Sequence, residues 1–163
     1  MKAIISCLLL AFSGILGHAQ TAPASGVSNL YVAGGSFSPG ASPAFAGTAL
    51  YAHSINASGT YAFTLIDVLP NTFKPFTVNT NVGIGIGQKI ATIAGLPVFI
   101  PTAAGISWNG SNTGWAWTTG AAVPFQLKKS NWYLMPNVRV LKSSVSGGTG
   151  YQPILGLLFG WGQ

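Results

Sequence analysis

The chain has 163 residues and carries little charge: seven Lys and Arg, one acid, and a formal net charge of +6 at pH 7. Charged residues make up 5% of the chain, against about 25% in ordinary soluble proteins, so the composition argues against a free soluble domain. Nine Phe, five Trp and five Tyr exclude a low-complexity chain, and cations this few and scattered argue against nucleic-acid binding.

Residues 1–19 are predicted to be a cleaved secretory signal peptide. Lys2 gives a positive start, 4–16 is a mostly apolar run, and 17–19 (GHA) is a small-x-small cleavage site. The apolar run is too short for a spanning helix, which needs about twenty residues. Cleavage would also remove Cys7, the only cysteine, so the mature chain is expected to have no disulfide and no thiol site.

The rest of the chain is predicted to be a short flexible leader, 20–27, followed by one β-domain, 28–163. In this domain strand-like segments alternate with clusters of Gly, Pro, Asn and Ser, the residue types that favour turns. A tilted strand needs about nine to eleven residues to cross a bilayer, and the predicted segments are long enough for this. Strands of soluble proteins more often have about five to six residues. The eight predicted strands are 28–37, 44–54, 60–68, 75–87, 96–107, 114–126, 131–142 and 151–161.

The segment 76–87, FTVNTNVGIGIG, has the clearest alternation. Successive side chains of a strand point to opposite faces. One face therefore carries an aliphatic row that includes Val82 and Ile84, and the other a small or polar row that includes Asn79 and Asn81. We expect the aliphatic row to face lipid and the polar row to line a packed interior. The first three segments and the last alternate less cleanly, and their phase is left open.

Export, low charge, many aromatic residues and the lack of a spanning helix in the predicted mature chain together favour one fold class. This class is all-β: an eight-stranded antiparallel up-and-down transmembrane β-barrel, with a lumen filled by side chains. Pro101 and Pro136 inside predicted strands, and Pro124 and Pro153 near strand ends, oppose this assignment. A closed barrel has no edge strand that tolerates a missing N–H group. The prolines therefore predict bulges, kinks or misplaced strand boundaries.

Threading the strands up and down gathers aromatic residues at both rims, as the girdles of a membrane barrel require. The residues expected at the outer rim are Phe37, Phe45, Trp108, Trp115, Trp117 and Tyr151. Those expected at the inner rim are Tyr31, Tyr51, Tyr61, Trp132, Phe159 and Trp161.

Residues 28–163 resemble the small eight-stranded outer-membrane barrels of the OmpA/OmpX type from Gram-negative bacteria. The closest motif is 156–161 (GLLFGW), which resembles the terminal assembly signal of these proteins, although two further residues follow it here. The resemblance implies that Gly156, Phe159 and Trp161 are read by the barrel-assembly machinery.

The residue types needed for catalysis or for metal binding are scarce. His53 is expected at the inner end of one strand and Asp67 at the outer end of the next, too far apart to act together. The predicted mature chain has no cluster of metal-ligating residues. The glycines of 83–87 alternate along a strand without a following helix or lysine, so they favour packing rather than nucleotide binding. We therefore predict no enzyme activity and no cofactor.

Two lysines and one ion pair are candidates for binding or structural roles. Lys74 and Lys142 are expected at the outer rim, where they could pair with lipopolysaccharide phosphates or simply be solvated. Arg139 is expected in the lumen, where a charge needs a partner, and Asp67 is the only acid. Asp67 shares its phase with Tyr61, so a lumen pair forms only if that strand turns this row inward.

The main hypothesis is a protein of the cell outer membrane with a structural or interaction role. Its expected partners are outer-membrane lipid, lipopolysaccharide and the barrel-assembly machinery, and its oligomeric state is left open. One alternative is a secreted soluble β-sandwich or a subunit of an extracellular assembly. Another is a narrow, porin-like pore or a lipid-binding barrel.

Overall fold

The computed structural model describes residues 27–39, 44–73, 76–128, 130–145 and 151–163. Regular structure within them is β-strand, and they contain no helix long and apolar enough to cross a membrane. The predicted signal peptide and leader, up to residue 26, lie outside the described residues. The strands are β1 (Asn29–Ser38), β2 (Ala44–Asn56), β3 (Thr60–Phe73), β4 (Phe76–Ile93), β5 (Leu96–Trp108), β6 (Thr113–Ala122), β7 (Phe125–Gln126), β8 (Trp132–Ser143) and β9 (Tyr151–Gly162).

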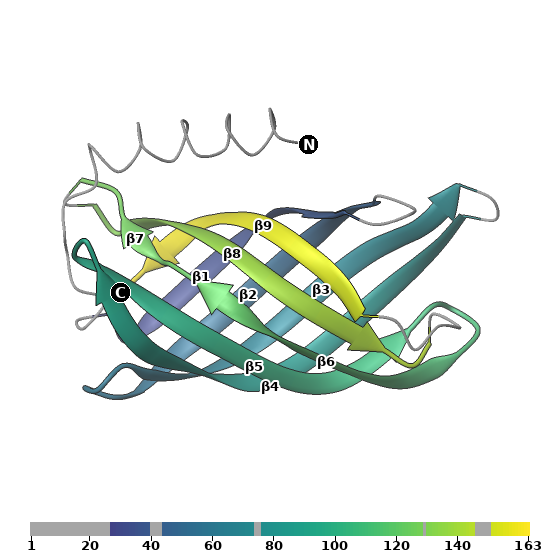
Figure 1. The fold of residues 1–163 in the computed structure, drawn as a ribbon, viewed down its shortest axis with the longest axis horizontal. Helices are drawn as coiled ribbons and strands as arrows, with labels where there is room; N and C mark the ends of the chain where they lie inside the picture. Colours follow the sequence, from purple (N-terminus) through teal and green to yellow (C-terminus); the bar gives the residue numbers. More distant parts are fainter. Residues whose placement is uncertain (1–26, 40–43, 74–75, 129, 146–150) are drawn as a thin grey trace.

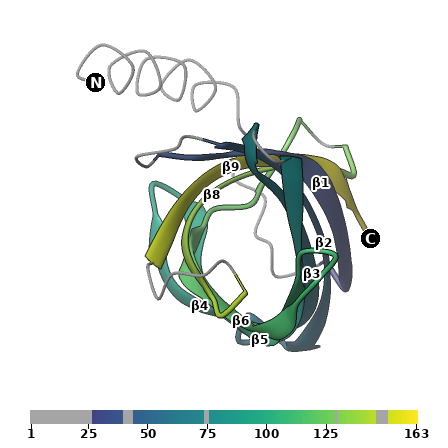
Figure 2. The same ribbon diagram turned by 90° about the vertical axis from the view of Figure 1, so that its right-hand side faces the viewer.

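The strands form one closed antiparallel barrel (Figure 1). From β1 to β6 each strand pairs with the next, β1 also pairs with β9, and β8 lies between β9 and β6. The two-residue β7 continues the line of β6 beside β8, so the wall has eight long strands. Seen end-on, the wall curves round a central space (Figure 2). The predicted all-β, eight-stranded antiparallel barrel is confirmed, and the sheet is not the two-layer sandwich of the alternative.

The two ends of the barrel are named here by what they contain. At one end Asn29 and Gln163 exchange two backbone hydrogen bonds of 2.8 and 2.9 Å, and we call this end the terminal rim. The opposite end is the far rim. The terminal rim corresponds to the predicted inner rim, and the far rim to the predicted outer rim.

Two strands are longer than predicted. β3 continues to Phe73 instead of 68, and β4 continues to Ile93 instead of 87. The end of β4 pairs with the start of β5 through a tight turn at Ala94 and Gly95, whose φ angles of 50° and 81° suit a hairpin turn. The polar residues of 88–93 indicated a loop, but pairing with a neighbouring strand outweighs such local preferences.

Pro101, Pro124 and Pro136 interrupt the pairing of neighbouring strands without shifting its register. β5 and β6 pair at Phe99↔Ala122 and again at Thr102↔Thr119, which skips Pro101 at constant register. Pro124 separates β6 from β7, so the predicted strand 114–126 is in fact two strands. Pro136 lies opposite this gap and pairs normally with β9. The expected bulges are therefore wrong at Pro101 and Pro136, because the barrel omits ladder bonds there instead.

Side chains alternate between the interior and the outer wall. On β4, Asn79 and Asn81 are 4% and 5% exposed, whereas Ile84 and Ile86 are 72% and 56% exposed. The interior itself is layered. An apolar cluster fills the half nearer the terminal rim: Leu30, Val32, Ala52, Tyr61, Phe63, Leu65, Phe99, Ala103, Ala122, Tyr133, Met135 and Leu158. A smaller apolar cluster lies toward the far rim: Ala46, Leu69, Ala116, Leu141 and Ile154.

Candidate functional site

The outer wall of the barrel is its most distinctive surface. Between the rims the side chains that point outward are aliphatic or small. The exposed large aliphatic residues of this wall are Ile66, Val68, Ile84, Ile86, Ile100, Ile106, Val138, Leu155 and Leu157. Soluble monomers rarely expose a continuous apolar surface of this kind. The wall is therefore suited to an apolar environment.

Aromatic side chains edge this wall at both ends. At the terminal rim, Tyr31 stacks on Tyr51 with ring centroids 4.8 Å apart, and Trp132 stacks on Phe159 at 4.9 Å. At the far rim the ring contacts are Phe37 with Phe45 and Trp117 with Tyr151, at 5.4 and 5.9 Å. The tryptophans predicted for the girdles lie on the outward face of their strands: Trp108, Trp115, Trp117, Trp132 and Trp161.

Tyr61 is the exception, because it lies in the interior and not in the girdle. It is 9% exposed, its hydroxyl donates to the Val27 carbonyl at 3.3 Å, and its ring packs edge-on against Phe99. β3 turns the row from Tyr61 to Asp67 inward, which leaves Ile66 and Val68 on the outer wall. The prediction failed because both rows of β3 are largely apolar.

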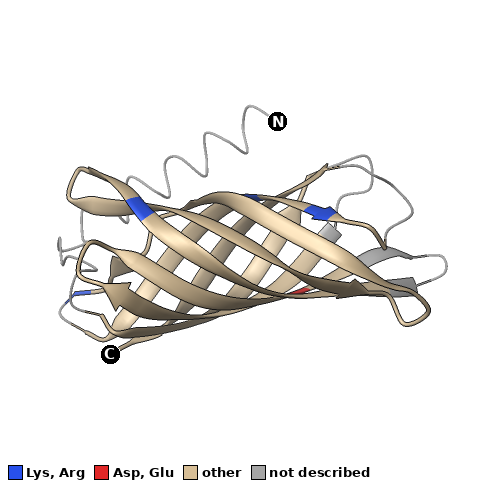
Figure 3. Ribbon diagram, turned by 90° about the horizontal axis from the view of Figure 1, so that it is seen from below, with Lys and Arg blue, Asp and Glu red and all other residues tan. Residues whose placement is uncertain are grey.

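Described charges are confined to the rims and to the interior (Figure 3). Lys128 lies in the exposed turn after β7, and the backbone N–H of Lys89 donates to Gly59 in the β2–β3 turn, both at the terminal rim. Lys142 lies near the far rim, with Nζ 5.1 Å from the centroid of the Tyr151 ring and 5.8 Å from that of Trp115. Lys74 lies outside the described residues.

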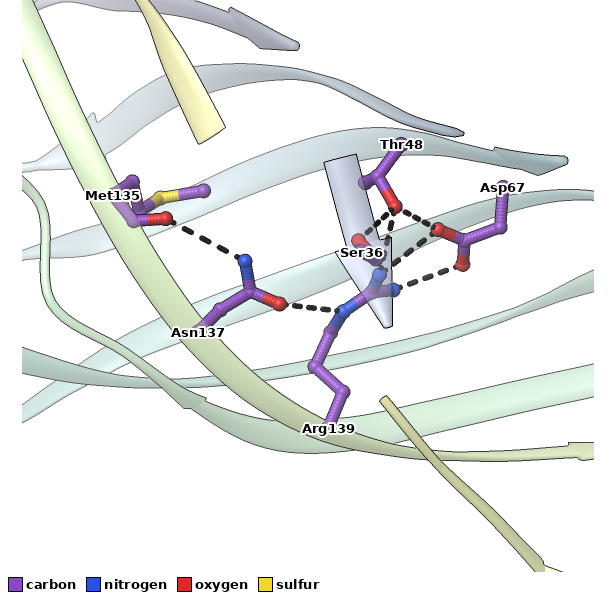
Figure 4. A network of polar contacts seen from close by, with 6 residues as sticks. All are labelled: Ser36, Thr48, Asp67, Met135, Asn137 and Arg139. Carbon is purple, nitrogen blue, oxygen red and sulfur yellow. Dashed lines mark hydrogen bonds and ion pairs between the residues drawn. The ribbon is translucent and has the colours of Figure 1, made fainter. Parts of the chain in front are cut away.

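Arg139 and Asp67 form a buried ion pair across the lumen (Figure 4). The two side chains are 4% and 1% exposed. Nη1 of Arg139 donates to Oδ2 of Asp67 at 2.9 Å, and Nη2 donates to Oδ1 at 2.8 Å. In the order of the sheet β8 and β3 are four strands apart, so in a ring of eight they lie on opposite walls. The pair therefore links opposite sides of the barrel.

Neighbouring side chains complete this network. Nε of Arg139 donates to Oδ1 of Asn137 at 3.0 Å. The Thr48 hydroxyl accepts from Nη2 of Arg139 at 3.2 Å and donates to Asp67 at 2.6 Å. Ser36 shares a hydrogen bond of 2.9 Å with Thr48. The network thus joins β8 to β3, β2 and β1. The sequence did not predict the roles of Ser36 and Thr48, because the phase of their strands was left open.

Nothing in this arrangement brings catalytic groups together. His53 lies on the outer face of β2, where its Nδ1 is 2.9 Å from Oδ1 of Asn29, while Asp67 is inside and bound to Arg139. Among the described residues no three His, Cys, Asp or Glu side chains form a group that could hold a metal ion. The network is a structural crosslink.

No protein-family model, no curated protein and no solved structure matches the chain. The resemblance to OmpA/OmpX-type barrels is one of architecture, a closed antiparallel barrel of eight long strands.

The crosslink gives a stability prediction. Arg139→Met leaves the Asp67 carboxylate buried without a counter-charge, and Asp67→Leu does the same to Arg139. Removing one partner of a buried pair costs about 3–5 kcal/mol, so we expect each single variant to lose that much unfolding free energy in denaturant titrations followed by tryptophan fluorescence.

The double variant Asp67→Leu/Arg139→Met removes both charges and should be more stable than either single variant. Lys128→Met, in an exposed turn, is the control and should change the unfolding free energy by less than about 0.5 kcal/mol. A double variant as unstable as the sum of the two single variants would show that the charges are not coupled.

Proposed function

We propose that this chain is an outer-membrane β-barrel protein of a Gram-negative envelope, with a structural or interaction role and no catalytic site. The observation that carries the proposal is the outer wall, where aliphatic side chains lie exposed between two aromatic bands while the buried ion pair lies inside. Membrane barrels need this distribution because lipid contacts their outer face and the interfacial rings meet the headgroups.

The filled lumen supports a structural or interaction role over conduction. Leu69, Ile154 and Leu158 are at most 1% exposed within the barrel, and eight strands leave an interior just wide enough for side chains. An ion would have to lose its hydration to cross the apolar cluster. The narrow-pore alternative therefore has little support, and current across a planar bilayer holding the purified protein would be the observation in its favour.

A subunit of an extracellular assembly remains the competing function. That alternative requires other chains to cover an apolar wall that runs over several adjoining strands, from Ile66 on β3 to Ile106 on β5 and on to Leu157 on β9. Lipid covers such a wall without a specific partner, so the membrane is the simpler environment.

The C-terminal strand also fits assembly in a membrane. Phe159 and Trp161 point outward on β9, on the face that the insertion machinery would meet. Gly156 has a separate structural reason to be glycine, because a Cβ there would lie 2.6 Å from Nδ2 of Asn137 and 2.9 Å from Oγ of Ser36. We propose that Gly156, Phe159 and Trp161 form the assembly signal.

Charge balance supports a proposal for the partner of the far rim. The chain has one acidic side chain, and Arg139 occupies it. Lys142 therefore has to find its counter-charge outside the chain's own side chains, and the rings of Trp115 and Tyr151 hold its ammonium group near the rim. We propose that Lys142, with Lys74 as a second candidate, contacts lipopolysaccharide phosphates.

Cell fractionation tests the proposed location. The full chain, expressed in a Gram-negative host, should be recovered in sarkosyl-resistant membranes. It should also change its mobility on an SDS gel when boiled, since folded barrels resist SDS. Recovery in the soluble periplasm or in the medium would overturn the proposal.

A matched pair of lysine substitutions tests which environment the wall faces. Ile84 and Gln88 share the outward face of β4, at mid-strand and toward the terminal rim. Lysine on the lipid face costs about 2–4 kcal/mol at the bilayer midplane and about 0–1 near the interface. Ile84→Lys should therefore abolish most membrane recovery, and Gln88→Lys should leave it unchanged. Equal recovery of the two variants would contradict lipid contact.

The lysine at the far rim is tested by titration with lipopolysaccharide. A lysine near an anionic membrane surface contributes about 1 kcal/mol, so Lys142→Gln should bind lipopolysaccharide about fivefold more weakly in detergent, measured by tryptophan fluorescence. Lys128→Gln, at the terminal rim, is the control and should bind as the wild type does. Equal weakening by both variants would indicate a nonspecific charge effect.

A further inference from the structure

The terminal half of the lumen contains an apolar cavity of about 70 Å³. Its walls include Leu30, Phe63, Phe99, Met135 and Leu158, contributed by five different strands. None of the roles proposed above uses this space. Apolar cavities in proteins stay dry and take up apolar molecules, so the lining defines the class of molecule that would fit.

The polar residues at one end of the cavity do not require a charged ligand. Arg139, Asn137 and Thr48 border the cavity on the side of the far rim. The Arg139 charge is already neutralised by two hydrogen bonds to Asp67 (Figure 4). An occupant therefore needs no anionic group. A cavity of about 150 Å³ accommodates benzene, so this smaller one suits the last few carbons of an alkyl chain.

One wall of the cavity coincides with an interruption of the sheet. Pro101, Pro124, Ala122 and Met135 all line the cavity. The pairing of β6 with β8 ends at Ala122↔Asn137 and resumes as β7 with β8 at Phe125↔Leu134. We call this interruption, at 123–124 opposite 135–136, the seam. A backbone hydrogen bond of 3.1 Å crosses it, from the Val123 N–H to the Pro136 carbonyl.

The seam has one backbone hydrogen bond fewer than a regular antiparallel pair. A proline has no N–H, so Pro136 cannot return the hydrogen bond that an antiparallel pair normally exchanges with Val123. At the terminal rim, Tyr61 and Tyr133 are buried, and Tyr61 is hydrogen-bonded to the Val27 carbonyl. Opening the seam would expose the cavity directly to whatever surrounds the outer wall.

We propose that the terminal half of the barrel binds the end of an alkyl chain, which enters laterally from surrounding lipid through the seam. The inference rests on the proposed membrane location, because lipid supplies chains at the height of the seam. It adds a lipid-tail site to a barrel otherwise assigned a structural role.

The site is tested through the methyl group of Met135. Met1 and Met135 are the two methionines of the chain, and Met135 lines the cavity. The protein is labelled with ¹³C at the methionine methyl and folded in dodecylphosphocholine, with its alkyl chain either protonated or deuterated. We expect nuclear Overhauser effects from the protonated chain to the Met135 methyl, absent with the deuterated chain.

Filling the cavity should remove this signal. Ala122→Leu and Ala52→Leu add side chains to the cavity from different strands, and either should reduce the effect at least fivefold. Ala121→Leu, on the neighbouring outward position, is the control and should keep it. Folding of each variant is checked by its mobility on an unboiled SDS gel. A missing signal in the wild type, or an unchanged signal in a folded filled variant, would overturn the site.

The route is tested by restoring a hydrogen bond. Pro136→Ala supplies an N–H that faces the Val123 carbonyl, and a bond worth about 1 kcal/mol slows opening about fivefold. The exchange rate of the bound chain should fall by that factor, while Pro153→Ala, in β9 near the far rim, should leave it unchanged. An unchanged rate in Pro136→Ala would overturn lateral entry.

These outcomes are independent of cell fractionation. The measurement is made in micelles, so a signal at Met135 supports the cavity even where the protein is recovered outside membranes. A protein recovered in membranes that gives no signal overturns the tail site alone.

Discussion

The closure of the sheet is the constraint on which the rest of the structure depends. Because β8 pairs with β6 and β1 pairs with β9, the eight long strands leave no open edge. Each side chain on these strands then has two possible places, the lumen or the outer wall. Small residues allow neighbouring strands to approach: a Cβ at Gly105 would overlap the Val82 carbonyl, and one at Gly85 would overlap the Thr102 carbonyl. In a closed sheet, alternate residues of a strand therefore face the lumen and the outer wall.

The chain has a single acidic side chain, and its burial affects the cations elsewhere in the chain. The single acidic side chain is buried and bound to Arg139, and this leaves the remaining cations without a carboxylate side chain as partner. A buried pair of this kind contributes little net stability compared with apolar packing. Its geometric effect is larger, because hydrogen bonds from β8 to β3 and β2 hold opposite walls at one spacing. The same bonds that fix the lumen therefore also occupy the chain's single acidic side chain.

The sequence predicted those strands best whose two faces differ most in polarity. β4 alternates between Ile and Asn or Gly, and its inward and outward rows were assigned correctly. β3 could not be phased, because Phe63 and Leu65 suit a lumen as well as they suit lipid. The position of Tyr61 was wrong for that reason. The Asp67–Arg139 contact joins residues 72 positions apart, and local pattern contains no information about which distant strand lies across the lumen. The sequence predicted that a buried Arg139 needs an acidic partner. It did not predict which face of β3 carries Asp67.

Pro101, Pro124 and Pro136 argued against a barrel, but they are compatible with one because the pairing is interrupted there without a change of register. A register shift in one pair of a closed sheet would have to be compensated round the whole ring, whereas a missing hydrogen bond affects two strands. This locality explains how Pro101, Pro124 and Pro136 coexist with regular pairing on either side. The interruptions all lie in the pairing of β6 and β7 with the neighbouring strands, next to the apolar half of the lumen. The pairing of β6 and β7 with β8 is thus interrupted beside the apolar half of the lumen, where Pro124 and Met135 line the cavity.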